Sequence, residues 1–199
     1  MVLVKSYTEP PICEKEILRY AGCKSSDEEL LQLLRACLEE ARPKLSYKVC
    51  YIELPVSITD ELCDFGCMGV KSKDLVKNLQ GCDKVILFAA TIGVEIDRLI
   101  TKYSHISQSK ALMFQAIGAE RIEALCDAFC EGMRPRFSPG YGDLPLEKQR
   151  EIFDILKCEK NIGLTLTDSL LMSPSKSVTA FVGVGMANQK ENVHKTQNK

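Results

Sequence analysis

The stretch Lys84–Ala90, KVILFAA, constrains the fold more than any other part of the chain. A nearly continuous apolar run of this length predicts a β-strand buried on both faces, because a strand with one solvent face alternates apolar and polar residues. Tyr47–Leu54 predicts a second strand. Alternate residues of a strand point the same way, so Cys50, Ile52 and Leu54 share one core face. With 45% of its residues hydrophobic, the chain can build a substantial core around these strands.

Several helices are predicted along the rest of the chain. The segment Ser26-Asp27-Glu28-Glu29 is a capping box, in which Ser26 caps the following helix and Glu29 folds back to it. Other helices are predicted from periodicity and turn residues at Glu14–Ala21, Asp74–Leu79, Val94–Ile100, Ser107–Met133 and Leu146–Cys158. Two further strands are predicted around Pro174, at Thr165–Met172 and Ser177–Val184. Together these elements predict a single α+β domain.

The domain has an appendage at each end. Residues 1–45 are predicted to form an N-terminal helical segment that packs on the main domain or docks beside it. Residues 46–186 form the main α+β domain, and the polar residues 187–199 form a disordered tail.

The formal net charge of −1 argues against nucleic acid or an anionic membrane as the main partner. The first residues lack the basic and apolar regions of a secretory signal, and no apolar run is long enough to span a membrane. A cytoplasmic location is therefore expected. In that compartment the ten cysteines are reduced thiols, and most of them are small buried hydrophobes.

Two cysteine pairs have a spacing of four residues, Cys63/Cys67 and Cys126/Cys130. On a helix each pair lies on one face and can bind a soft metal, so a thiol-based metal or redox protein built on Cys63/Cys67 is one hypothesis. Neither pair has the C-x-x-C spacing of zinc ribbons, and core packing explains the second pair better. The only histidines are His105 and His194. No catalytic residue and no metal ligand is therefore predicted.

Glu123 stands out on the long helix because it falls within an apolar stripe. The stripe is formed by residues at three- and four-residue steps: Leu112, Ala116, Ala119, Ile122, Cys126, Phe129 and Met133. A carboxylate on a buried face is costly unless a cation or hydrogen-bond donors meet it. Two interpretations stay open. Glu123 reaches solvent past short side chains or pairs with a structural arginine, or it lines a ligand cavity and meets an ammonium group.

The hexapeptide Arg136–Tyr141, RFSPGY, supplies what such a cavity lacks. Arg136 can hold a carboxylate with two parallel N–H groups, Gly140 lets the backbone approach a ligand, and Tyr141 offers a ring and a hydroxyl. Glu123 and Arg136 together can hold the two ends of a zwitterionic amino acid. The alternative is an ordinary proline turn with a surface arginine and a packing tyrosine.

Four longer motifs occur in order along roughly residues 45–185: GCDKVILFAATIGVEIDRLI, QAIGAERIEALCD, RFSPGYGDLPLEKQ and KNIGLTLTDSLLMSPSKSVTAFVGVG. With them the chain resembles the activation domain of cobalamin-dependent methionine synthase, and in particular the short, free-standing relatives of that domain. The resemblance implies a mainly antiparallel sheet with a long helix and several shorter helices. It also implies binding of S-adenosylmethionine next to a corrinoid cofactor.

The resemblance assigns ligand-binding roles to Arg136, Ser138, Gly140, Tyr141 and Glu123. It implies a separate corrinoid-carrying methionine synthase chain as partner, with cobalamin bound to that chain. Flavodoxin or another electron donor would reduce Co(II) to Co(I), which then takes the methyl group of S-adenosylmethionine.

Two parts of the family pattern are missing, because the chain has no tryptophan for an N-terminal Asp-Trp segment and no tyrosine after Gly185. The missing Asp-Trp segment favours the alternative of a non-catalytic module that docks a corrinoid protein without using S-adenosylmethionine, whereas the intact RFSPGY and Glu123 favour S-adenosylmethionine binding.

Overall fold

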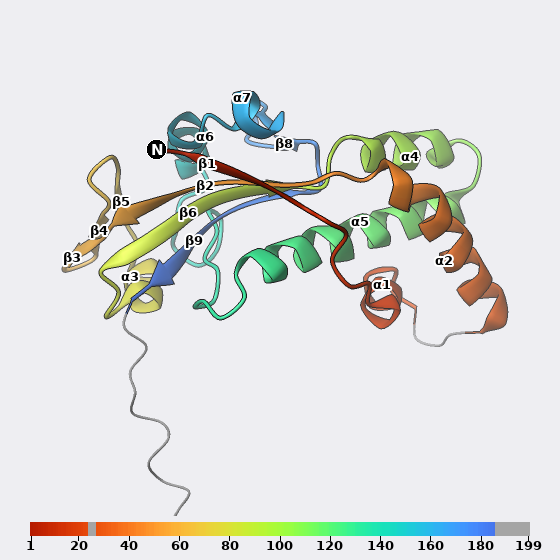
Figure 1. Ribbon diagram of the computed structural model, residues 1–199, viewed down its shortest axis with the longest axis horizontal. Coiled ribbons are helices and arrows are strands. Elements are labelled where there is room, and N and C mark those ends of the chain that lie inside the picture. Colours follow the sequence, from red (N-terminus) through yellow and green to blue (C-terminus); the bar gives the residue numbers. More distant parts are fainter. Residues whose placement is uncertain (24–26, 186–199) are drawn as a thin grey trace, which may run out of the picture.

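The computed structural model describes residues 1–23 and 27–185, so the tail predicted at residues 187–199 lies outside the described residues. A four-stranded antiparallel sheet forms the centre of the fold (Figure 1). Its strands follow the order β1 (Leu3–Tyr7), β2 (Tyr47–Pro55), β6 (Lys84–Thr91) and β9 (Ser177–Val184). The predicted central strand is confirmed, because β6 lies between β2 and β9 and every residue after Lys84 is buried.

Alternate side chains of the sheet enter two separate hydrophobic cores. On one face, Val49, Phe88 and Val182 pack with helices α1 (Glu14–Tyr20), α2 (Glu28–Ala41), α4 (Glu95–Ser104) and α5 (Gln108–Phe129). On the other face, residues such as Leu87 and Phe181 pack with α3 (Lys73–Leu79), α6 (Lys148–Leu156) and α7 (Cys158–Ile162). Figure 1 shows α5 running along one face of the sheet, with α6 and α7 on the other. The predicted α+β fold, with its long helix and antiparallel sheet, is confirmed.

The short strands were not predicted correctly. A three-stranded meander of β3 (Ser57–Thr59), β4 (Leu62–Asp64) and β5 (Gly69–Lys71) occupies a stretch without a predicted element. The strand predicted at Thr165–Met172 is wrong, because this segment folds back on itself. It forms β7 (Thr165–Leu166) and β8 (Met172–Ser173), which are joined by a turn closed by a hydrogen bond from Thr167 N to Leu171 O of 2.9 Å.

Helix boundaries also differ from the predictions at several positions. The long helix α5 ends at Phe129, four residues before the predicted Met133, and Gly132 in the following turn has a φ of +74°. The predicted helix Leu146–Cys158 is split into α6 and α7 at Lys157, whose φ is +49°. For α2 the cap is Asp27, whose side chain accepts a hydrogen bond from Leu30 N at 2.8 Å. Ser26, the predicted cap, lies outside the described residues.

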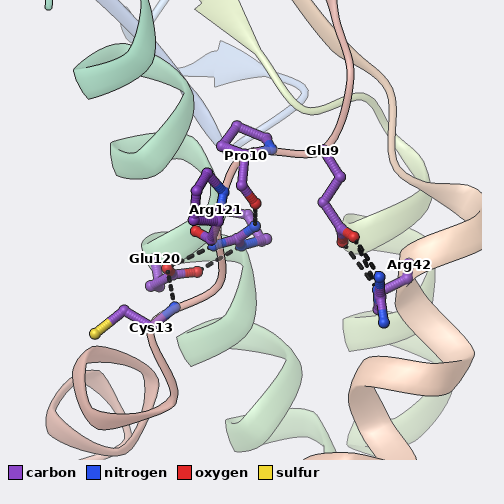
Figure 2. A network of polar contacts seen from close by, with 7 residues as sticks. Glu9, Pro10, Cys13, Arg42, Glu120 and Arg121 are labelled. Atoms are coloured by element: carbon purple, nitrogen blue, oxygen red, sulfur yellow. Dashed lines mark hydrogen bonds and ion pairs between the residues drawn. The ribbon is translucent and has the colours of Figure 1, made fainter.

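The N-terminal segment is joined to the rest of the fold by a strand and by buried ionic contacts. β1 pairs along its whole length with β2, and a short 3-10 helix (Arg42–Lys44) leads from α2 into β2. Arg121 of α5 donates hydrogen bonds of 2.7 Å to the carbonyl oxygens of Pro10 and Pro11. Figure 2 shows the contact with Pro10. Glu120 receives a bond of 3.0 Å from Cys13 N and pairs with Arg121 at 2.5 Å. Both side chains are almost fully buried, so the segment before α1 is fixed to the middle of α5.

Within the two described ranges, no helix combines the length and the apolar character needed to cross a bilayer.

Candidate functional site

The segment 136–141 is attached to the outer edge of β9 by one backbone bridge. Phe137 forms a two-way bridge with Phe181, in which each backbone N–H donates to the other residue's carbonyl oxygen at 2.9 Å. β9 is the last strand of the sheet, so this bridge adds the segment to an edge that would otherwise be unpaired. The bridge places Arg136 and Ser138 beside β9.

A tight turn follows the bridge and explains the proline and the glycine. Tyr141 N donates to Ser138 O at 3.1 Å, which closes a four-residue turn with Pro139 and Gly140 in the middle. Gly140 has a φ of +89°, the value that a type II turn requires at its third position and that glycine adopts without strain. Its N–H donates to Leu144 O at 2.9 Å. In the structure, therefore, Gly140 shapes the turn.

The next residues attach this loop to the start of α3. The Asp143 carboxylate accepts hydrogen bonds from Ser72 Oγ, from Lys73 N at 2.8 Å and from Asp74 N at 3.2 Å. Ser72 in turn caps α3 by accepting a hydrogen bond from Leu75 N at 3.0 Å. The hydrogen bonds from Ser72 and from these backbone N–H groups hold the pKa of Asp143 below its usual value.

Replacing Asp143 by alanine is expected to loosen this attachment. Loss of the acceptor should make the amide hydrogens of Lys73 and Asp74 exchange roughly fivefold faster, the effect of losing a typical helix cap. Acid should act in the same direction. The pKa of Asp143 is lower in the folded state than in the unfolded state. Its stabilisation of the attachment to α3 is therefore fully present above the unfolded-state pKa and is lost as the pH falls through the folded-state pKa. Hydrogen exchange measured by mass spectrometry tests this, with the exposed Asp154→Ala as the control.

A pocket of about 720 Å³ lies between this loop, the end of α5 and β9. We call it the edge pocket. It has the size of typical small-molecule sites, which occupy roughly 300–1,000 Å³. It is lined by Glu123, Asp127 and Cys130 from the end of α5, by Met133–Arg136, Ser138, Pro139 and Tyr141 from the loop, by Gln149, and by Met172, Ser177, Val178 and Thr179. Of the five residues predicted to bind a ligand, Glu123, Arg136, Ser138 and Tyr141 line it, whereas Gly140 does not.

Arg136 and Glu123 meet directly inside the edge pocket. Arg136 Nη2 lies 2.6 Å from Glu123 Oε2, and Nη1 lies 2.6 Å from Asp127 Oδ1. Burial alone would lower the pKa of Arg136, but these acids outweigh burial and raise it. Asp127 was not predicted from the sequence, although it lies one helical turn after Glu123 and therefore on the same side of α5.

The buried centre of α5 differs from the predicted stripe. Glu123 is 42% exposed in its side chain, and Leu112, the first residue of that stripe, is 53% exposed. The acidic residue buried in α5 is Glu120, next to Arg121. α5 packs against other helices as well as the sheet, so a single apolar stripe does not describe its buried surface. Glu123 pairs with Arg136, as the first interpretation expects, and it also lines the edge pocket.

The charges of the edge pocket are balanced. Glu123 and Asp127 are acidic, whereas Arg134 and Arg136 are basic. Arg134 is held by bonds of 3.2 and 2.9 Å to the carbonyl oxygens of Asn78 and Gln80 at the end of α3. Two opposite pairs of charges suit a zwitterion better than a phosphate group, which needs an excess of positive charge.

Cys63 and Cys67 are not arranged as a helical metal site. Cys63 is buried in β4 and Cys67 is exposed in the turn before β5, so the helix assumed for this pair is wrong. Among the residues that the structure describes, no three His, Cys, Asp or Glu side chains come together as metal ligands. Burial raises the pKa of Cys130 to about 11, although Arg136 opposes the shift. Burial also raises the pKa of Cys63 to about 11.

These differences predict an order of thiol reactivity. The exposed Cys13 and Cys67 should react first with iodoacetamide at pH 7.5. Cys130 should react at least roughly tenfold more slowly, because the thiolate is the reactive form and burial disfavours it. Peptide mass spectrometry over time measures the order. A small molecule bound in the edge pocket should slow Cys130 further without changing Cys67. Equal rates at Cys130 and Cys67 would contradict the burial of Cys130.

Comparison with known families agrees with the motifs. Residues 119–198 match the family model described as "Vitamin B12 dependent methionine synthase, activation domain". The match includes all five predicted site residues, from Glu123 to Tyr141. The resemblance predicted from the sequence is therefore confirmed for the part of the chain that carries the edge pocket.

Known proteins extend this comparison. The chain is 38% identical over 96 residues to the methionine synthase of Mycobacterium tuberculosis (strain ATCC 25618 / H37Rv). It is 34% identical over 96 residues to that of Mycobacterium leprae (strain TN). Each alignment covers 46% of this chain and only 8% of the relative's length. The crystal structure of the MetH reactivation domain bound to AdoHcy matches 92% of this chain and 78% of the other, with a TM-score of 0.71 and 14% sequence identity. This likeness shows a shared fold.

Proposed function

We propose that this chain binds S-adenosylmethionine in the edge pocket and supports the reductive remethylation of a corrinoid carried by a separate methionine synthase chain. The observation that carries the proposal is the cluster of Arg136, Glu123 and Asp127 in one pocket of balanced charge. The shared fold with a reactivation domain that binds AdoHcy supports it.

The cluster matches the amino-acid end of the ligand. A guanidinium has five N–H donors, and the two bonds to Glu123 and Asp127 leave donors for the ligand carboxylate. The two acids can then accept hydrogen bonds from the ligand ammonium. Ser138 presents its backbone to the ligand, and Tyr141, which is 69% exposed, presents its ring. The cationic sulfonium also favours a pocket with two carboxylates nearby.

The chain's contribution to the reaction is positioning. The corrinoid on the partner would supply the cobalt nucleophile, returned to its reactive state by one electron from flavodoxin or a similar donor. On transfer of the methyl group to the reduced corrinoid, the methyl–sulfur bond would break with both electrons going to sulfur, so that S-adenosylhomocysteine would leave. This transfer needs no general base, and no residue of the edge pocket is required to move a proton. This chain can increase the rate by holding the methyl group toward the corrinoid.

Calorimetric titration and a reactivation assay test the proposal. S-adenosylmethionine should bind saturably to the chain at one site. Added to a corrinoid methionine synthase chain in the Co(II) state, with a one-electron donor, the complex should produce methylcobalamin and equimolar S-adenosylhomocysteine. Absence of binding at millimolar ligand, with the corrinoid chain present, would reject the proposal and favour the non-catalytic docking module.

A further inference from the structure

Arg136 already binds two acids of the chain itself. Its Nη1 donates to Asp127 Oδ1 and its Nη2 donates to Glu123 Oε2, each at 2.6 Å. A carboxylate that is held by two parallel N–H groups uses two neighbouring nitrogens of a guanidinium. Every such pair of nitrogens includes Nη1 or Nη2, so an incoming carboxylate lies next to at least one of these acids. Two carboxylates this close repel each other and compete for the same cation.

Asp127 is the acid that can leave Arg136 more easily. Its side chain is 74% exposed, whereas that of Glu123 is 42% exposed, so water can solvate the Asp127 carboxylate when it turns away. Arg136 is less free to move, because its side chain is only 23% exposed and the next residue, Phe137, is bridged to β9. We therefore expect an incoming carboxylate to displace Asp127 and to leave Arg136 in place.

This exchange balances charge only for some ligands. A simple carboxylate takes over the guanidinium and leaves the Asp127 carboxylate without a cation, beside a second negative charge. An amino acid carries an ammonium group on the same carbon as its carboxylate, so Asp127 can pair with that ammonium instead. The same holds for a ligand whose amino-acid end is part of a larger molecule.

We propose that Asp127 is a specificity-determining residue, which competes with incoming carboxylates for Arg136 and thereby restricts the edge pocket to ligands with an amino-acid end; this rests on the proposed function. Asp127 lies outside the RFSPGY segment, and the family resemblance assigns no role to it. A carboxylate without an ammonium group is rejected, although Arg136 alone would hold it well.

Binding of S-adenosylhomocysteine and of its desamino analogue, in which hydrogen replaces the ammonium group, tests this. NMR titration suits both compounds, because it also measures weak binding. The unaltered chain should prefer S-adenosylhomocysteine by on the order of 10- to 100-fold, the usual effect of losing a charged hydrogen-bonding group. Asp127→Asn should bind the desamino analogue about three- to tenfold more tightly than the unaltered chain does, because the competitor for Arg136 is gone. It should bind S-adenosylhomocysteine no more tightly, since the ammonium loses a partner.

The rise in affinity for the desamino analogue is the decisive result. A residue that only contacts the ligand ammonium would leave that affinity unchanged when it is replaced. Asp127→Asn should unfold close to the temperature of the unaltered chain, because the ion pair it removes is largely exposed.

Two controls separate the contact with Arg136 from the general charge of the chain. Asp127→Glu keeps the carboxylate and should keep the rejection of the desamino analogue. Glu131→Gln removes an exposed carboxylate just after the end of α5, whereas the acids bonded to Arg136 are Glu123 and Asp127. Its affinity for the desamino analogue should stay within about twofold of the unaltered chain, because exposed charges that are not in contact are screened by salt.

The outcomes distinguish this inference from the proposed function. If the chain binds neither compound, the proposed function fails and the inference fails with it. If the chain binds S-adenosylhomocysteine but Asp127→Asn gains no affinity for the desamino analogue, the inference is overturned while ligand binding stands. Equal binding of both compounds to the unaltered chain, or an equal gain for both in Asp127→Asn, also overturns it, because Asp127 would then not select for an amino-acid end.

Discussion

Replacing Arg136 by alanine is expected to weaken the binding of S-adenosylmethionine roughly 100-fold, because hydrogen bonds to charged groups contribute about 1.5–3 kcal/mol. The substitution removes the only group in the cluster that can hold the ligand carboxylate. It also leaves Glu123 and Asp127 beside that carboxylate without their cation, since both pair with Arg136 at 2.6 Å. Calorimetric titration of the variant measures the change.

Matched variants identify the cause of any loss of affinity for S-adenosylmethionine. Arg136→Lys keeps the charge but loses the planar pair of donors, so its affinity should lie between those of the parent and Arg136→Ala. Arg98→Ala removes an exposed arginine that pairs with Glu95 on α4, and it should leave binding unchanged. Thermal unfolding of Arg136→Ala should stay close to the parent, since partly exposed ion pairs contribute at most about 1 kcal/mol. An affinity within threefold of the parent would show that Arg136 does not contact the ligand.

Replacing Arg121 by methionine is expected to lower the free energy of unfolding by about 3–5 kcal/mol, the usual cost of leaving a buried charge without its partner. Glu120, which is 4% exposed, would lose its ion-pair partner. The carbonyl oxygens of Pro10 and Pro11 would lose the guanidinium that bonds to them (Figure 2). Urea unfolding followed by circular dichroism measures the change.

The same region offers a control. Arg42 pairs with Glu9 at 2.7 Å, but its side chain is 54% exposed, so Arg42→Met should lower the free energy of unfolding far less than Arg121→Met. The double variant Glu120→Leu/Arg121→Met removes both buried charges and should be more stable than Arg121→Met alone. Equal effects of Arg42→Met and Arg121→Met would contradict a dominant role of the buried pair in fixing the N-terminal segment.

The long elements of the fold were predictable because their patterns are local. Lys84–Ala90 has no polar residue after the lysine, and its short length and apolar composition favour a strand covered on both faces. The meander of β3 to β5 and the hairpin of β7 and β8 have strands of two or three residues. Such short strands depend on contacts with distant parts of the chain, so their own residues carry little signal.

The candidate site could be predicted only where its residues lie in a recognisable segment. RFSPGY and Glu123 were identified from the sequence, and four of the five residues lie in one pocket. Asp127 was missed although its spacing from Glu123 places both on one side of a helix.

The most direct test of ligand binding in the edge pocket is the ¹³C-methyl NMR spectrum of the methionines during titration with S-adenosylhomocysteine. Met133 and Met172 line the edge pocket, whereas Met68 and Met113 are buried in the two cores. The signals of Met133 and Met172 should shift progressively to saturation while those of Met68 and Met113 stay in place. Unchanged Met133 and Met172 signals at millimolar ligand would contradict binding at this pocket.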